Sequence, residues 1–337
     1  MKRIMAVYDV DPFYAERLAE FANQKEKTPF TVVAFTSLTR LKQFAEEQPV
    51  ELLLAGDGVP EECLKELDIR QVMRLGEVKD MTAPDVPVIY KYQSSDAVLR
   101  EVMACYQVQP EQMPLMAVGI RSTIIGICSP VGRCGKTGFG FTLGQIMARD
   151  SKVLFLGLEE YSALSRLTQT QYAATLTDLV YYYQSGEYNR MRLASVVYSW
   201  NGMDYIPPVS YAEDLAELDG EEFAGLIRRI AAEGIYDAVI LDLGHLVRKL
   251  EPVLEQCDMI YAPIREDCVS AAKVDAWHSY ILHSGREELW ERIRLLKLPV
   301  PSTVRPAESY LEQLLWGEVG DFCRSLLKGT KGGGYEH

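Results

Sequence analysis

The fold is decided by residues 123–137, which read TIIGICSPVGRCGKT. The apolar, β-branched run at 123–128 is typical of a buried strand, and residues 138–149 have the composition of a helix. Between them lies a glycine-containing loop that ends in Gly135-Lys136-Thr137. In this order of strand, loop and helix, backbone N–H groups at a helix N-terminus can surround a phosphate group. The stretch therefore predicts a parallel α/β domain with a phosphate-binding loop.

The side chains of this loop have distinct expected roles. Gly132 and Gly135 permit close approach of the backbone, Lys136 would reach the β- and γ-phosphates, and the Thr137 hydroxyl would bind Mg²⁺. Pro130 stands where the first glycine of the plain GxxxxGK[ST] motif belongs, so an ordinary strand-to-helix turn that ends in GKT is the alternative. The predicted nucleotide-binding residues are Gly132, Arg133, Cys134, Gly135, Lys136, Thr137 and Gly138.

A second element supports the loop. Residues 234–244, GIYDAVILDLG, form an apolar strand that ends in Asp242 and is followed by glycine. In phosphate-loop enzymes a buried strand directs such a carboxylate at the nucleotide's Mg²⁺ or at a water molecule on it. Many parallel strands end in aspartate, so a solvated strand-end carboxylate is the alternative. Together with the GKT loop, Asp242 is predicted to be a metal-binding and catalytic residue.

The length of the chain and the alternation of its patterns predict two domains. Its 337 residues exceed the usual size of a single hydrophobic core. The first hundred residues alternate five times between strand and helix patterns, which indicates a doubly wound parallel sheet. A break without periodicity and with two prolines, QVQPEQMP, follows. We therefore predict two α/β domains of this type, at residues 1–108 and 122–328, joined by a linker at 109–121 and followed by a flexible tail at 329–337.

Composition restricts the partners. Asp and Glu total 48 against 35 Lys and Arg, and the net charge of −13 would repel nucleic acid and anionic lipid. No stretch of about 18 uncharged apolar residues predicts a membrane span. Residues 310–327 predict one amphipathic helix with an acidic polar face, which we expect to pack on the domain core rather than on a membrane. Seven cysteines without a CxxC pair, and no secretory leader, predict a reduced cytoplasmic protein.

Residues 122–328 resemble the ParA/MinD group of deviant-Walker P-loop ATPases, whose loop reads KGGxGK[ST]. Gly132 and the Gly135-Lys136-Thr137 ending match that loop, whereas Val131 replaces the family's signature lysine and Arg133 its second glycine. The resemblance implies a homodimer with ATP and Mg²⁺ as cofactors, the metal lying at Thr137 and Asp242. Arg133 would either replace the missing lysine as a cation acting across the dimer or point to solvent.

The strand after the loop's helix reads VLFLGLE at residues 153–159. In the ParA/MinD group the corresponding strand ends in an acidic pair, so here Gly157 and Glu159 take those places. The resemblance implies that Glu159 orients water, with Lys136 and Asp242 as the other catalytic residues. Since the signature lysine is absent, we expect an atypical ATPase that binds ATP with weak or absent hydrolysis.

The N-terminal domain is similar to a response-regulator receiver. Asp9 and Asp11 match the acidic residues after the first strand, and Lys91 matches the lysine after the fifth. The phosphoacceptor position is taken by Gly56, and Asp57 stands one residue later. A phosphoaspartyl site needs carboxylate, Mg²⁺ and lysine held together, and a shift of one residue points the side chain elsewhere. We therefore expect a pseudo-receiver that serves for contacts.

A receiver-like domain followed by an atypical ParA/MinD ATPase is the arrangement of the TadZ/CpaE family, which this chain resembles. The resemblance implies a localisation and assembly factor of the Tad (Flp) pilus and tight-adherence secretion machinery. Such a factor acts as a dimer in the cytoplasm, at the cell pole next to the inner membrane, and recruits other pilus proteins. The first alternative is a ParA-like ATPase that positions DNA or the division site, which would need a basic surface. A catalytic P-loop enzyme such as a tyrosine autokinase, and a phosphorelay receiver, are further alternatives.

Overall fold

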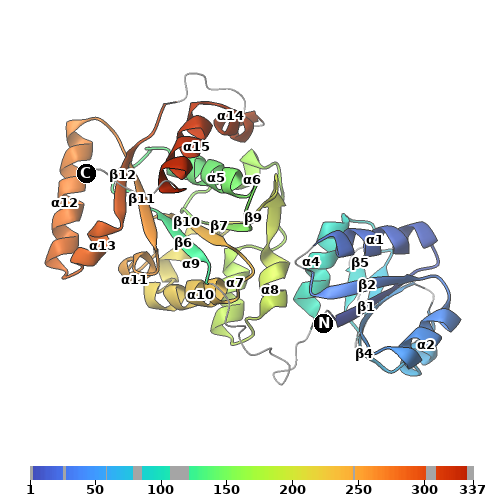
Figure 1. The fold of residues 1–337 in the computed structure, drawn as a ribbon. Coiled ribbons are helices and arrows are strands. Elements are labelled where there is room, and N and C mark those ends of the chain that lie inside the picture. The colour runs from blue at the N-terminus through green and yellow to red at the C-terminus, as the bar shows by residue number, and fades with distance from the viewer. Residues whose placement is uncertain are drawn as a thin grey trace. The chain divides into compact units, whose positions relative to one another are not determined.

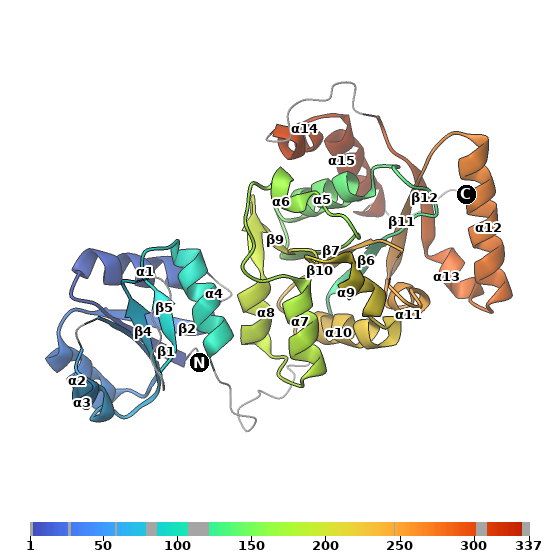
Figure 2. The same ribbon diagram turned by 180° about the vertical axis from the view of Figure 1, so that it is seen from behind.

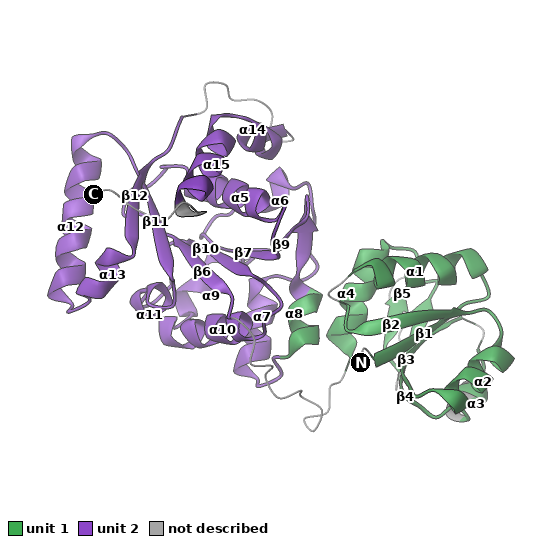
Figure 3. Cartoon of the chain, viewed as in Figure 1, with its two compact units in different colours: residues 1–113, 189–195 green, residues 114–188, 196–337 purple. Residues whose placement is uncertain are grey.

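The chain forms two compact units, which are coloured separately in Figure 3. The computed structural model describes residues 3–25, 28–57, 59–78, 86–106, 121–245, 247–300 and 309–331. One unit comprises residues 1–113 together with 189–195, and the other comprises 114–188 and 196–337. Each has its own parallel sheet with helices on both faces (Figure 1), so the predicted fold class is confirmed. Apart from Arg121, the predicted linker lies outside the described residues.

The first unit alternates between strands and helices, with five strands and four helices among the described residues of 1–113. Its elements are β1 (Arg3–Tyr8), α1 (Pro12–Gln24), β2 (Phe30–Phe35), α2 (Leu38–Glu47), β3 (Val50–Gly56), α3 (Glu61–Lys65), β4 (Ile69–Gly76), β5 (Val88–Tyr90) and α4 (Ser95–Cys105). All five strands are parallel, in the order β2-β1-β3-β4-β5. The strand order reverses between β1 and β3, and the carboxyl ends of strands at such a switch point are the usual place of a site in this fold.

Successive residues of β3 face opposite sides of this sheet. Leu52 and Leu54 pack in the hydrophobic cluster that contains α1 and α4, whereas Leu53 and Ala55 pack in the cluster that contains α2 and α3. Figures 1 and 2 show these two helix pairs on the two faces. A strand buried on both faces has a continuous apolar sequence, which is the reason that LLLA is recognisable as a strand.

The second unit contains a seven-stranded sheet. Along the chain, the elements from residue 123 onward are β6 (Thr123–Ile127), α5 (Lys136–Met147), β7 (Val153–Leu158), α6 (Leu164–Leu167), α7 (Leu176–Gln184), α8 (Arg190–Val196), β8 (Tyr198–Trp200), β9 (Met203–Ile206), α9 (Ala212–Glu217), α10 (Gly220–Ala232), β10 (Ala238–Leu243), α11 (Glu251–Leu254), β11 (Met259–Ile264), α12 (Cys268–His283), α13 (Glu287–Glu291), β12 (Ile293–Lys297), α14 (Tyr310–Trp316) and α15 (Glu318–Lys331). Residues 189–195, which include most of α8, group with the first unit.

The strand order β12-β11-β6-β10-β7-β9-β8 places the loop strand in the middle of this sheet. Only β8 runs antiparallel to its neighbour, β9. In the register of the central strands, Asp242 of β10 lies opposite Ile127 of β6 and Gly157 of β7. The loop after β6, Asp242 and the residues that follow β7 therefore meet at one edge of the sheet.

Two helices expected to be continuous are each broken in two. The apolar spacing of residues 215–232 also predicts a single helix, but the structure interrupts it between α9 and α10, where the Asp219 side chain accepts a hydrogen bond from the Glu221 N–H and starts a new helix. The helix predicted at 310–327 is interrupted by Gly317, whose backbone is extended. Buried apolar residues stand on both sides of each break, so the apolar pattern alone could not locate it. Helix α15 continues to Lys331, beyond the predicted start of the tail, and residues 332–337 lie outside the described residues.

The C-terminal helices pack on the core of the second unit, as expected. Leu311, Leu314, Leu315, Val319 and Cys323 are buried in the cluster that contains α5. Within the described part of the chain, none of the helices combines the length and the apolarity needed to cross a membrane.

Candidate functional site

The loop between β6 and α5 is held in place by its own buried side chains. The Ser129 hydroxyl donates a hydrogen bond to the carbonyl oxygen of Pro263 at 2.6 Å and accepts one from the Val131 N–H at 3.0 Å. The Cys134 thiol donates to the Val131 carbonyl oxygen. Ser129, Val131 and Cys134 are all buried, whereas Gly132 and Arg133 are exposed. The buried side of the loop is therefore attached to β11, and its other side, at Gly132 and Arg133, is open to solvent.

Two residues of the loop have left-handed backbone conformations. Gly135, immediately before α5, has φ = 87°, which explains the need for glycine at this position. Arg133 has φ = 54°, a region that costs an L-residue about 1–2 kcal/mol. The Arg133 side chain is exposed and makes no ion pair within the described residues, so its two predicted alternatives remain open.

Helix α5 begins at Lys136, two residues earlier than the sequence predicts. Lys136 and Thr137 therefore lie in its first turn, where the backbone N–H groups lack partners within the helix. A Cβ added at Gly132 would meet no atom within 4 Å, and one added at Gly135 would meet only Leu298, so the space above the turn is open. Gly138 instead lies against α14, where a Cβ would come within 2.9 Å of Leu314.

Lys136, Thr137 and Asp242 are brought together with Glu159 at this edge of the sheet. The Lys136 ammonium lies 3.0 Å from Glu159 Oε1, and the Thr137 hydroxyl donates to Glu159 Oε2 at 2.7 Å. Glu159 therefore binds both the ammonium and the hydroxyl with which a phosphate loop would contact a nucleotide and its metal. Burial is the largest single effect on the pKa of Lys136 and acts to lower it, but Glu159 and Asp242 together raise it above its usual value, so the ammonium stays charged.

Asp242 is the buried carboxyl at the centre of this group. It is 1% exposed, and neither of its oxygens accepts a hydrogen bond within the described residues. Burial, followed by the negative charge of Glu159, raises the pKa of Asp242 to about 7, and the nearby Thr137 and Lys136 offset this only in part. A buried carboxylate without a partner is costly, and a divalent cation beside it would relieve that cost.

These residues fit a Mg²⁺ ion bound with a nucleotide. Hard cations prefer oxygen ligands, and Mg²⁺ is commonly held by one or two protein oxygens together with phosphate oxygens and water. The Thr137 hydroxyl and the Asp242 carboxylate are such oxygens, and the open turn above them can hold phosphate groups. The sequence predicted both residues, but it gave no indication that Ser129 attaches the loop to β11.

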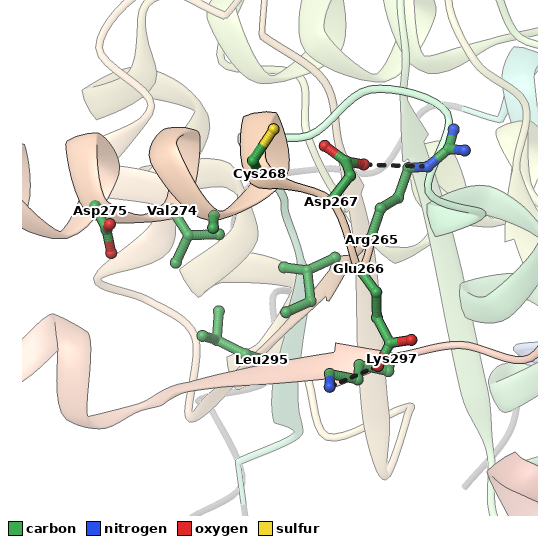
Figure 4. A pocket seen from close by; sticks show the side chains of 10 residues that line it. Arg265, Glu266, Asp267, Cys268, Val274, Asp275, Leu295 and Lys297 are labelled. Carbon is green, nitrogen blue, oxygen red and sulfur yellow. Dashed lines mark ion pairs between the residues drawn. The ribbon is translucent and has the colours of Figure 1, made fainter.

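A cavity of about 520 Å³ lies between α12 and strands β11 and β12 (Figure 4). Its wall includes Ile264 and Leu295, and ion pairs of Arg265 with Asp267 at 3.8 Å and of Glu266 with Lys297 at 2.7 Å lie beside it. The cavity starts directly after Pro263, the residue to which the loop is attached. The apolar run at residues 259–263 predicts the strand β11, but the sequence gives no sign of this cavity, because α12 has no clear apolar face.

Two of the residues that the sequence likens to a receiver site, Asp9 and Lys91, form an ion pair in the first unit. The Lys91 ammonium lies 2.8 Å from Asp9 Oδ2, and both side chains are buried. A Cβ at Gly56 would come within 2.8 Å of the same oxygen, so an aspartate at this position would collide with the pair. Asp57 lies one step away, where its carboxylate accepts a hydrogen bond from the Glu77 N–H at 2.9 Å.

Because of this geometry, incubation with a small phosphodonor is expected to leave the chain unphosphorylated. Lys91, which would stabilise a phosphoryl group, is already paired with Asp9, and Asp57 is engaged at the strand end. Intact-mass spectrometry checks this result. A stable phosphoryl adduct that is lost in an Asp57→Asn variant would contradict it.

Comparison with known proteins yields similarities of fold alone. No family model matches the chain, and no curated protein sequence matches it. The solved structures of similar fold include a plasmid partition protein from Borrelia burgdorferi, 15% identical, with a TM-score of 0.45 over 62% of this chain and 99% of that one. They also include apo McdA from Cyanothece (16% identical, TM-score 0.43, 59% and 82% covered) and cobyrinic acid a,c-diamide synthase from Mycobacterium smegmatis with bound ADP and magnesium (12% identical, TM-score 0.45, 63% and 97% covered). Likeness at this level assigns no activity, so the chemistry must be argued from the loop itself.

Proposed function

We propose that the second unit is an ATP-binding P-loop domain of ParA/MinD type that hydrolyses ATP slowly or not at all. The observation that carries this proposal is Asp242, a buried carboxyl group whose oxygens accept no well-formed hydrogen bond among the described residues, although Thr137 and Lys136 lie close enough to lower its pKa. An ordinary strand-to-helix turn has no reason to bury a carboxylate at such cost.

The residues of the site would act together on the triphosphate. Backbone N–H groups of residues 132–137 would surround the β-phosphate, and Lys136 would leave Glu159 to donate to the phosphate oxygens. Mg²⁺, bound with the nucleotide at Thr137 and Asp242, would supply neutralisation of the phosphate charge. Glu159, once released, would hold a water molecule near the terminal phosphate. Val131 is buried and uncharged, so the loop lacks the family's lysine, which supports slow turnover.

The cavity after β11 is the proposed place of the nucleotide base. Its volume lies within the usual range for small-ligand sites, and its walls combine four apolar side chains with five charged ones. The hydrogen bond from Ser129 to Pro263 joins the phosphate loop to the start of this cavity, so both parts of one ligand could be held at once.

The test is calorimetry of the purified chain with Mg·ATP, followed by sedimentation with and without the nucleotide. We expect saturable binding and a shift from monomer to dimer in the presence of Mg·ATP. A chain that binds no adenine nucleotide at millimolar concentration would contradict the proposal. A chain that stays monomeric both with and without Mg·ATP would contradict nucleotide-dependent dimerisation.

Replacing Glu159 by Gln is expected to change binding and turnover in opposite directions. The neutral amide would hold Lys136 and Thr137 less strongly, so the affinity for Mg·ATP should rise several-fold, because bonds to charged groups are the stronger ones. ATP turnover, already expected below about 1 s⁻¹ in the parent chain, should fall further. Calorimetry and a phosphate-release assay measure the two effects. Glu187→Gln, a substitution at an exposed residue, is the matched control. A faster or unchanged turnover would exclude Glu159 from the reaction.

At the level of the cell, the proposed role is localisation and assembly of the Tad (Flp) pilus, as a dimer that recruits other pilus proteins. The support is the order of the two domains: a receiver-like unit without a phosphoacceptor, followed by a P-loop unit without the signature lysine. The alternative, a partitioning ATPase acting on DNA, predicts a mobility shift of duplex DNA at low salt. With a net charge of −13 we expect no shift.

A further inference from the structure

All the large, exposed apolar side chains in the described part of the first unit lie at one edge of its sheet. They are Val10 (70% exposed), Phe13 (74%), Val78 (66%) and Tyr92 (59%). Val10 and Phe13 follow β1, Val78 follows β4, and Tyr92 follows β5. Single exposed apolar residues are ordinary, but their concentration at the carboxyl ends of the strands is typical of an interaction surface.

The same edge carries three acidic side chains at its surface. Asp11 precedes Phe13 and accepts a hydrogen bond from its N–H at 3.0 Å. Asp57 accepts from the Glu77 N–H, and Glu77 in turn accepts from the Tyr92 hydroxyl at 3.2 Å. The described contacts of these three carboxylates leave one oxygen of each without a protein hydrogen bond. The acidic and apolar side chains are therefore interleaved in one surface.

The centre of this edge is already filled and neutralised. Lys91 and Asp9 form a buried ion pair, with 7% and 1% of their side chains exposed. Gly56 closes the space beside them, since even a Cβ there would lie 2.8 Å from Asp9. Asp9, Asp11, Asp57 and Glu77 outnumber two cations, Lys91 and Arg74, the second of which donates to the Val59 carbonyl oxygen just after β3. A net charge of about −2 therefore remains at neutral pH. A ligand must therefore contact the rim rather than enter the site.

We infer that this acidic and apolar edge of the first unit docks a segment of another protein in which Arg or Lys residues alternate with apolar ones. The argument is charge complementarity. The cationic side chains would pair with Asp11, Asp57 and Glu77, while the apolar ones would cover Phe13 and its exposed neighbours. Anionic lipid and nucleic acid carry the wrong charge for this surface, and a small cation would leave the apolar side chains uncovered. The inference concerns the first unit and does not depend on nucleotide binding.

The test uses the full chain and a fluorescein-labelled peptide in which Arg and Leu alternate, followed by fluorescence anisotropy at physiological salt. We expect saturable binding, which Phe13→Ser and Glu77→Gln each weaken about tenfold. Glu16→Gln and Glu20→Gln are the matched controls. Both glutamates are exposed on α1 of the same unit, and each substitution removes the same charge as Glu77→Gln. They should change the affinity less than twofold. Mg·ATP affinity should be the same in all four variants.

Three results would overturn this inference. One is no saturable binding of the Arg–Leu peptide by the parent chain. Another is an equal loss of affinity in the Glu77 variant and in the two controls, since the peptide would then respond only to overall charge. The third is comparable binding of a peptide in which Glu replaces Arg, which would show that charge does not select the partner.

Discussion

Replacing Lys136 by Ala is expected to weaken Mg·ATP binding by on the order of 100-fold. The ammonium is largely buried in the first turn of α5, where it would form charge-assisted hydrogen bonds with the phosphates. Each such bond contributes roughly 1.5–3 kcal/mol, and each 1.4 kcal/mol is a factor of ten in affinity. Isothermal titration calorimetry of the purified variant measures the change.

Folding of this variant needs its own control, because Glu159 and Asp242 lose their nearest cation. Lys136→Met keeps the apolar stem of the side chain and should show the same loss of affinity. Lys249→Ala removes an exposed lysine that lies 3.7 Å from Asp219, and it should bind as the parent chain does. Circular dichroism verifies that each variant is folded. Parent-like affinity in both Lys136 variants would refute the assignment of the phosphate loop.

The Asp242→Asn variant is expected to be more stable than the parent chain without nucleotide at pH 8, by roughly 2 kcal/mol. Burial and the charge of Glu159 raise the pKa of Asp242 from 3.8 to about 7 in the folded chain. The folded state then holds its proton more tightly than the unfolded state does. Its charged form is destabilising, on the order of 4 kcal/mol, and this cost is present in full above pH 7. The buried amide of Asn, which lacks partners, would offset part of the gain.

The sign of the pH dependence distinguishes this explanation from a general packing effect. As the pH falls from about 7 to 4, the parent chain takes up the proton and recovers the cost of about 4 kcal/mol, so the variant should change from the more stable to the less stable of the two proteins. Denaturant unfolding of both proteins across this range measures the difference, with Asp150→Asn as an exposed control. A constant difference at all pH values would contradict the raised pKa.

The nucleotide should reverse the order of stability. Asp242→Asn removes a proposed Mg²⁺ ligand, so Mg·ATP should stabilise the parent chain more than the variant. Binding to the parent chain near pH 7 should also release a proton from Asp242, which calorimetry in buffers of different ionisation enthalpy detects. The variant should release none from this position.

The fold class could be predicted from the sequence because it depends on local patterns. Strand β3 is buried on both faces and reads as an unbroken apolar run, and the loop before α5 ends in a motif with few structural contexts. The breaks at Asp219 and Gly317 could not be placed in this way, because the apolar stripe continues through them. The β8–β9 hairpin and helix α12 were also missed. Helix α12 is exposed over most of its length and has no clear apolar face.

In the candidate site, the sequence was enough to choose the residues but not to predict their contacts. Each of Lys136, Thr137, Glu159 and Asp242 could be chosen from the sequence, since each stands at a strand end or a helix start. Their mutual contacts could not, because they depend on the strand order that sets β6 beside β10 and β10 beside β7. The ion pair of Glu159 with Lys136 and its hydrogen bond with Thr137 are consequences of that order.

Local composition and spacing were enough to predict the two α/β domains, which the structure confirms. They also predicted the phosphate-loop residues and the missing acceptor at Gly56, and both of these stay predictions. Three features became visible only in the folded chain. Asp242 accepts no well-formed hydrogen bond among the described residues, Lys91 is neutralised by Asp9, and exposed apolar and acidic side chains share one edge of the first unit. Burial and charge balance depend on residues that are distant in the sequence, and the packing of parallel strands brings these within a few ångströms of one another.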